Sequence, residues 1–200
     1  MQQAKTQNTR EHPQTDDLTL VQLEEQLRDL ENRVKSISIG MPENKLAMIV
    51  FSGDLDKALA SFIIATGARA MGMDVVMFFT FWGTPLLRDK SKSPGKKDLM
   101  GKMFGAMLPK GVDGLKLSKM NMGGMGTAMM KSLMKKKNVA SLEQMINLAG
   151  ELGVRIFICE MSMDLMGFKR EEMIDYPHLD FAGVATFLQE AGTSKVQLFI

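Results

Sequence analysis

The side chain best suited to chemistry in this sequence is Cys159, the only cysteine among the 200 residues. It ends a short β-branched and apolar run, 154–159, that is typical of a buried strand. In open α/β sheets, ligands collect at the carboxyl ends of the strands. The next residues indicate a helix start, with Ser162 as N-cap and Asp164 in the first turn. Because helix N-termini favour thiolates, Cys159 is the predicted nucleophile, and we expect it to be partly accessible.

The surroundings of Cys159 limit what the thiol can do. A single cysteine excludes an intrachain disulfide or a dithiol cycle, and His12 and His178 are too far apart in sequence to suggest a metal cluster. No histidine or lysine lies next to Cys159 as a base, which argues against a Cys–His hydrolase. A thiol that accepts and passes on a sulfur atom needs only thiolate character, access and a donor. The alternative is an inert core cysteine, the usual state of a lone buried thiol.

The elements that position Cys159 follow from periodicity. Apolar runs at 45–51 and 74–80 predict strands, and the segment 55–71 between them predicts a helix. This spacing indicates a βαβ unit with parallel strands. A helix at 139–152 is expected, with Ser141 and Gln144 as a capping box. We also expect a helix at 181–190 and a last strand at 196–200, which suits an edge position in the sheet. Together these elements form an α/β domain at 45–200.

Strand ends also suggest the wall of a pocket. Gly53 and Asp54 follow the first strand, Trp82 follows the second, and Met161 and Ser162 follow Cys159. The turn 52–54 matches neither phosphate-binding glycine motif. Its backbone N–H groups can hold an anion at a helix start, but a plain turn is the favoured interpretation. No metal site is predicted.

The segment 86–138 is an insertion that a simple crossover does not need. Residues 88–137 hold thirteen Lys or Arg, three Asp and nine Met, and we expect short helices near 98–107 and 126–136. Copper binding is not favoured, because the methionines lie among flexible glycines and lysines. We expect a lid whose lysines, such as those at 135–137, raise the potential around Cys159, or an adaptable partner surface, and the two roles are not exclusive.

The N-terminal part differs in composition. Residues 1–16 are polar and predicted to be disordered. The segment 17–40 predicts an amphipathic helix with a coiled-coil-like heptad seam, whose apolar residues are Leu20, Leu23, Leu27, Leu30, Val34 and Ile37. We expect it to join subunits, and the alternative is a helix that folds back on its own domain.

Composition excludes some classes of function. A net charge of +2 does not indicate a nucleic-acid partner. The sequence has no signal-peptide pattern and no run of 18 apolar residues, so we expect no transmembrane segment and a cytoplasmic protein.

Four segments resemble the DsrE/DsrF-like family, in particular its Met-rich, long-insert branch. They are 119–130 (KMNMGGMGTAMM), 138–143 (NVASLE), 159–167 (CEMSMDLMG) and 183–188 (GVATFL). The resemblance covers about residues 45–200 and implies a flavodoxin-like three-layer α/β sandwich with a mainly parallel sheet. It implies homo-oligomers and sulfur relay, with a persulfide on Cys159, no organic cofactor, and rhodanese-like or TusA-like carriers as partners.

Resemblance to this family does not decide whether the chain is an enzyme, that is a sulfurtransferase, or only a sulfur carrier. Two other functions stay open. One is an oligomeric scaffold that binds a partner and in which Cys159 is replaceable. The other is a nucleotide- or flavin-binding module, which follows from the fold alone.

Overall fold

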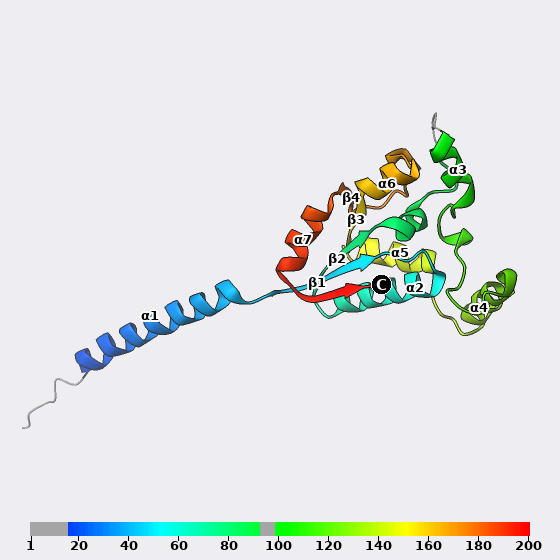
Figure 1. The fold of residues 1–200 in the computed structure, drawn as a ribbon. Coiled ribbons are helices and arrows are strands. Elements are labelled where there is room, and N and C mark those ends of the chain that lie inside the picture. Colours follow the sequence, from blue (N-terminus) through cyan, green and yellow to red (C-terminus); the bar gives the residue numbers. More distant parts are fainter. Residues whose placement is uncertain (1–15, 93–98) are drawn as a thin grey trace, which may run out of the picture. The chain divides into compact units, whose positions relative to one another are not determined.

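The structure is a computed structural model that describes residues 16–92 and 99–200. The chain forms two compact units, which divide after Met41. The first unit contains helix α1 (Asp16–Gly40), and the second, Pro42–Ile200, contains an α/β domain (Figure 1). Apart from Asp16, the tail predicted to be disordered lies outside the described residues.

Helix α1 carries its apolar seam on the outside. Five of the six seam residues have described side chains, and each is 54–63% exposed: Leu20, Leu23, Leu27, Leu30 and Val34. The side chain of Ile37 lies outside the described part of the helix. The seam is therefore a narrow apolar stripe on a helix whose other residues are mostly polar.

Five strands in the described part of the second unit form one parallel sheet. They are β1 (Glu43–Val50), β2 (Asp74–Phe79), β3 (Arg155–Cys159), β4 (Leu179–Ala182) and β5 (Ser194–Phe199). Their order is β4-β3-β2-β1-β5, which differs from the 2-1-3-4-5 order of flavodoxin itself. The predicted α/β class with a parallel sheet, and the parallel pairing of the first two strands, are confirmed.

The C-terminal strand β5 occupies one edge, as its sequence suggested, and β4 occupies the other. Strand β4 was missed, because Phe181 was assigned to the last helix. It pairs instead with Ile158, and Ala182 pairs with Cys159, so that α7 (Val184–Gly192) begins only afterwards. A four-residue strand has too short a pattern to be separated from a following helix, and pairing with β3 decides its structure.

Helices cover both faces of the sheet, which gives the predicted three layers (Figure 1). Helices α2 (Leu55–Ala70) and α5 (Leu142–Glu151) pack side by side on one face over the larger core cluster. Helix α7 lies on the other face, over a small cluster that comprises Ala47, Phe78, Cys159, Phe187 and Ala191. The Phe78 and Phe187 rings stack with their centroids 5.2 Å apart. Cys159 thus points to the more thinly covered face.

Helices α2 and α5 differ in what fixes them: a local cap begins α5, and packing on the sheet sets the buried stripe of α2. The capping box of α5 is confirmed, because Ser141 Oγ accepts from the Gln144 amide and Gln144 Oε1 accepts from the Ser141 amide. In α2, Ile63 is apolar but faces outward, and its side chain is 52% exposed. The buried stripe of α2 includes Phe62 and Ala65, and Ile63 lies about 100° around the helix from Phe62.

The remaining elements include α3 and α4, which lie where insertion helices were predicted. They are η1 (Phe81–Leu87), α3 (Leu99–Met107), η2 (Val112–Gly114), η3 (Met122–Gly124), α4 (Met125–Lys136), α6 (Glu160–Met166) and η4 (Arg170–Glu172). Among the described residues, none of the helices has the length and apolar character needed to span a membrane.

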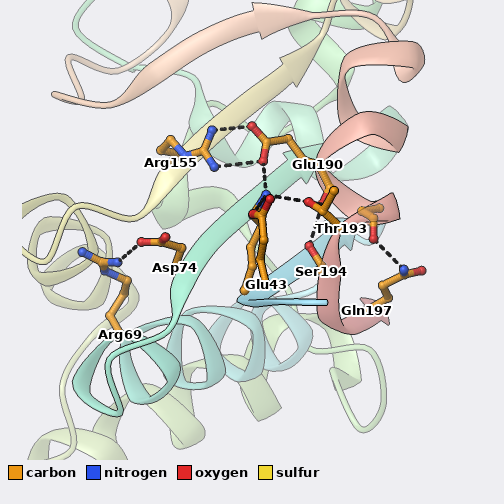
Figure 2. Close-up of polar contacts among 10 residues, drawn as sticks. Glu43, Arg69, Asp74, Arg155, Glu190, Thr193, Ser194 and Gln197 are labelled. Carbon is orange, nitrogen blue, oxygen red and sulfur yellow. Dashed lines mark hydrogen bonds and ion pairs between the residues drawn. The ribbon is translucent and has the colours of Figure 1, made fainter. Parts of the chain in front are cut away.

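Charged side chains fasten α7 to the amino end of the sheet (Figure 2). Glu190 of α7 accepts hydrogen bonds from Arg155 Nη1 at 2.5 Å and Nη2 at 3.0 Å, and from Lys45 Nζ at 2.9 Å. The bonds from Arg155, helped by Lys45 and opposed by burial, lower the pKa of Glu190 to about 2. Lys45 also donates to Thr193 Oγ1 at 3.0 Å. These bonds hold α7 over the cluster that contains Cys159.

Candidate functional site

Cys159 is the last residue of β3 and the N-cap of α6. The chain leaves the strand at once, so the thiol lies at the carboxyl edge of the sheet. Its side chain is only 3% exposed, which contradicts the expectation of partial access. The thiol points toward the α7 face, because Ile156 and Ile158 alternate with it and face the core under α2 and α5. Any reaction of the thiol therefore needs a local opening.

Ser162 has a different role from the predicted N-cap. Helix α6 begins at Glu160, which makes Ser162 its third residue, and its side chain is fully buried. Ser162 Oγ accepts from the Phe81 amide at 3.0 Å and shares a 2.9 Å hydrogen bond with Thr80 Oγ1. Phe81 has a φ of 45°, an uncommon value for a residue with a side chain. Ser162 thus fixes α6 to a strained turn after β2.

The loops that follow β1 and β2 are in backbone contact. A Cβ atom on Gly53 would lie 2.4 Å from the carbonyl oxygen of Trp82, and one on Gly83 would lie 2.3 Å from the oxygen of Val50. Only glycine allows these approaches. They position Trp82, whose side chain is 48% exposed, beside the turn that contains Gly53.

A cavity of about 570 Å³ opens between these two loops and the insertion. Gly53, Asp54 and Trp82 line it, together with Lys57 and Lys116. The structure therefore brings three of the predicted pocket residues together. Cys159, Met161 and Ser162 do not line this cavity, because β3 is separated from β1 by β2 and the Cys159 thiol points to the α7 face.

The start of α2 is already occupied by protein groups. The Leu55 amide donates to the carbonyl oxygen of Lys116 at 2.8 Å, and the Asp54 amide donates to Ser52 Oγ at 3.2 Å. Asp54 forms an ion pair with Lys57 at 3.1 Å. The insertion, rather than an anion, satisfies this helix start, which supports the plain-turn interpretation.

The surface next to Cys159 mixes apolar and charged groups. Met161 is 56% exposed, and Glu160 is paired with Arg170. The Arg170 guanidinium lies 4.6 Å from the centroid of the Phe181 ring. Met161 therefore lies at the surface beside the site, and the acidic residue next to the thiol has its own cation.

A buried ion pair holds the chain after η1 against the chain after α6. Arg88 Nη2 lies 3.1 Å from Glu172 Oε2, and both side chains are 2% exposed. The guanidinium also lies 4.4 Å from the centroid of the Phe168 ring. This ion pair is thus a second link, besides the Ser162 hydrogen bonds, between the chain that follows β2 and the chain that follows β3.

The described part of the insertion, residues 86–92 and 99–138, does not form the predicted lysine lid over Cys159. Its helix α4 borders α5, and Lys131 and Lys135 line a groove of about 750 Å³ between them. Helix α5 covers the face of the sheet opposite to the one toward which Cys159 points. Helix α3 is the part of the insertion that lies next to α6. No group of three His, Cys, Asp or Glu suited to a metal occurs in the described residues.

The sequence did not identify three residues that shape the surroundings of Cys159, which are Thr80, Phe81 and Phe187. Thr80 is a polar residue at a strand end, which was the available signal for it. The positive φ of Phe81 has no sequence signal, because glycine and asparagine are the residues that normally indicate such a turn. Phe187 could not be linked to Cys159 before the face of α7 was known.

The sequence of this chain is similar to those of known proteins. Residues 42–199 match the model of the DsrE/DsrF/DrsH-like family. Protein YrkE of Bacillus subtilis is 47% identical over 156 residues, which cover 78% of this chain and 96% of YrkE. The sulfur carrier protein DsrE2 of Allochromatium vinosum is 40% identical over 164 residues, which cover 80% of this chain and 100% of DsrE2. The E. coli protein YchN aligns with a TM-score of 0.48 and 11% identity, over 78% of this chain and 98% of YchN.

Proposed function

The chain belongs to the DsrE/DsrF/DrsH-like family, and from this we propose that it works in sulfur relay, with Cys159 as the residue that carries the sulfur. The observation that carries the proposal is the place of the chain's single thiol, at the carboxyl end of an interior strand and at the N-cap of a helix. The relationship to a protein named as a sulfur carrier supports it.

The proposed reaction is thiol exchange at the outer sulfur of a persulfide. The Cys159 thiolate attacks the outer sulfur of a persulfide on a donor protein. The donor's sulfur–sulfur bond breaks, the donor thiolate leaves with that electron pair, and a new sulfur–sulfur bond forms on Cys159. An acceptor thiolate then attacks the same outer sulfur and releases the Cys159 thiolate. The outer sulfur keeps its proton in both transfers, and no net oxidation occurs.

Loading requires that the buried thiol be uncovered. We propose that α7 moves, because this nine-residue helix is the cover on the side toward which Cys159 points. Its outer residues Val184 and Leu188 are well exposed, so they do not anchor the helix. The contacts that anchor α7 are the stacking of the Phe187 ring on Phe78 and the ion pairs of Glu190.

Helix α3, the part of the insertion that lies next to α6, is the proposed docking surface for donor and acceptor, which the family resemblance suggests are rhodanese-like and TusA-like carriers. Helix α3 exposes an i, i+4, i+8 apolar stripe of Leu99, Met103 and Met107. A similar stripe lies on α4, which borders α5 away from the thiol, and it comprises Met125, Met129 and Leu133. Lys102, which is exposed and three residues after Leu99, borders the stripe on α3. Flexible methionines beside lysines suit a partner surface with acidic residues around an apolar centre.

The second candidate function is an oligomeric scaffold with an inert Cys159, and the burial of the thiol favours it. The intact mass of the protein after exposure to a persulfide donor, such as thiosulfate with rhodanese, distinguishes the two. The sulfur-relay proposal predicts a gain of one sulfur atom that Cys159→Ser abolishes. A wild-type mass that stays unchanged, under conditions in which another carrier protein is loaded, would instead support the scaffold.

A further inference from the structure

We propose that α1 forms a parallel, in-register coiled coil with α1 of a second copy of this chain. Its a positions are Leu20, Leu27 and Val34, and its d positions are Leu23 and Leu30. All five side chains are more than half exposed, although they are the most apolar part of the helix. A stripe that repeats every three and four residues fits the seam between paired helices. It is narrower than the face that a helix normally buries against its own domain.

The charges beside the seam favour one direction of pairing with a second copy. The e positions include Glu24 and Glu31, and the g positions include Gln26 and Arg33. In an antiparallel pair with full overlap, e faces e, so that Glu24 of each copy would lie opposite Glu31 of the other. Like charges so placed repel.

A parallel pair removes this repulsion. In that arrangement a g position faces the e position of the next heptad in the other helix. Gln26 then lies opposite Glu31 of the second copy, where its amide can donate to the carboxylate, and no acidic residue faces another. Arg33 remains free to keep its exposed ion pair with Asp29 of its own helix, at 3.9 Å. The charge pattern is therefore compatible with self-association in one direction.

The direction has a consequence for the α/β units. The chain passes from α1 through Met41 and Pro42 to β1, so each α/β unit follows the carboxyl end of its helix. Parallel pairing attaches both units to the same end of the coiled coil. Antiparallel pairing would attach them to opposite ends of a helix about 37 Å long. Parallel pairing thus raises the concentration of one α/β unit around the other, whatever Cys159 does.

Disulfide trapping in the full chain tests the direction, because Cys159→Ser leaves no other cysteine. Leu23→Cys places a thiol at a d position, where two parallel helices bring the residues within disulfide distance. In an antiparallel pair, residue 23 would instead lie opposite Val34, about 16 Å along the helix from its equivalent. Glu25→Cys, on the outer face, is the matched control.

We expect Leu23→Cys to give a covalent dimer under mild oxidation at least about tenfold faster than Glu25→Cys. A mixture of Leu23→Cys and Val34→Cys chains should give mainly the 23–23 and 34–34 dimers. Dominance of the mixed 23–34 dimer would show antiparallel pairing and overturn the proposal. Equal, slow rates for residues 23 and 25 would also overturn it, because the seam would then not face a second copy.

Light scattering on the chain without introduced cysteines gives a second readout. Leu23→Asp with Leu30→Asp should lower the mass or make it fall on dilution, whereas Glu25→Lys should leave it unchanged. A double variant that keeps the wild-type mass at every concentration would show that the seam does not join copies.

Discussion

The hydroxyl of Ser162 accepts a hydrogen bond from the amide of Phe81 at 3.0 Å, which joins the helix after Cys159 to the turn after β2. Thr80 Oγ1 lies 2.9 Å from the same hydroxyl. One buried oxygen therefore serves the ends of two neighbouring strands. The geometry around the thiol depends on this link as much as on the strand that bears the thiol.

Replacing Ser162 with alanine should destabilise the α/β unit. The change leaves the Phe81 amide and the Thr80 hydroxyl without their partner in a buried place, which costs about 1–3 kcal/mol. Urea denaturation followed by circular dichroism measures the loss. Ser132→Ala, on the exposed face of α4, is the control and should change the free energy of unfolding by less than about 0.5 kcal/mol. Equal effects of the two variants would mean that the Ser162 bonds do not contribute.

Shortening Phe187 should speed alkylation of Cys159. Phe187→Leu removes the ring that stacks on Phe78 and weakens the packing of α7 over the thiol. Reaction with iodoacetamide under native conditions, followed by intact mass, reports how often the thiol is uncovered. We expect a severalfold higher rate than in the wild-type chain.

The matched control for this test is Phe62→Leu, which removes the same atoms from the core under α2, on the opposite face. It should cost about 1–2 kcal/mol of stability, as a partial truncation of a buried ring does, without opening the α7 face. If Phe62→Leu accelerates alkylation as much as Phe187→Leu, the thiol is reached by global unfolding and α7 is not its cover.

Acid should weaken the attachment of α7 at Glu190. The folded-state pKa of Glu190 is about 2, below the usual 4.5, because Arg155 and then Lys45 bind its carboxylate. A group whose pKa is lowered by folding stabilises the protein above its unfolded pKa, and this contribution is lost as the pH falls from about 4.5 to about 2. The urea midpoint should therefore fall across this range.

Glu190→Gln isolates the contribution of Glu190 to that fall. The variant should be less stable at neutral pH and should show a shallower loss between pH 4.5 and 2 than the wild type. Glu171→Gln, at an exposed position, is the control and should keep the wild-type slope. Identical slopes for the wild type and Glu190→Gln would contradict the assigned role of this carboxylate.

The sequence predicted the strand that ends at Cys159 and the parallel pair before it, because apolar runs and glycine stops are local signals. It did not predict that the thiol is buried. Burial depends on which face Cys159 points to, and on α7 returning over that face from residues 184–192. Ser162 was found for the wrong reason, since its partners Thr80 and Phe81 are about eighty residues away. Long-range contacts of this kind have no local pattern.

The close approach of Gly53 to Trp82 gives a final prediction. Gly53→Ala would put a Cβ atom 2.4 Å from the carbonyl oxygen of Trp82, so the two loops must separate. We expect a loss of more than about 1 kcal/mol and a shifted fluorescence spectrum, which is specific because Trp82 is the only tryptophan. Gly67→Ala in α2 has no atom within 4 Å of the new Cβ and should stabilise the helix by about 0.5–1 kcal/mol with no spectral change. An unchanged spectrum and stability in Gly53→Ala would show that the two loops do not need this contact.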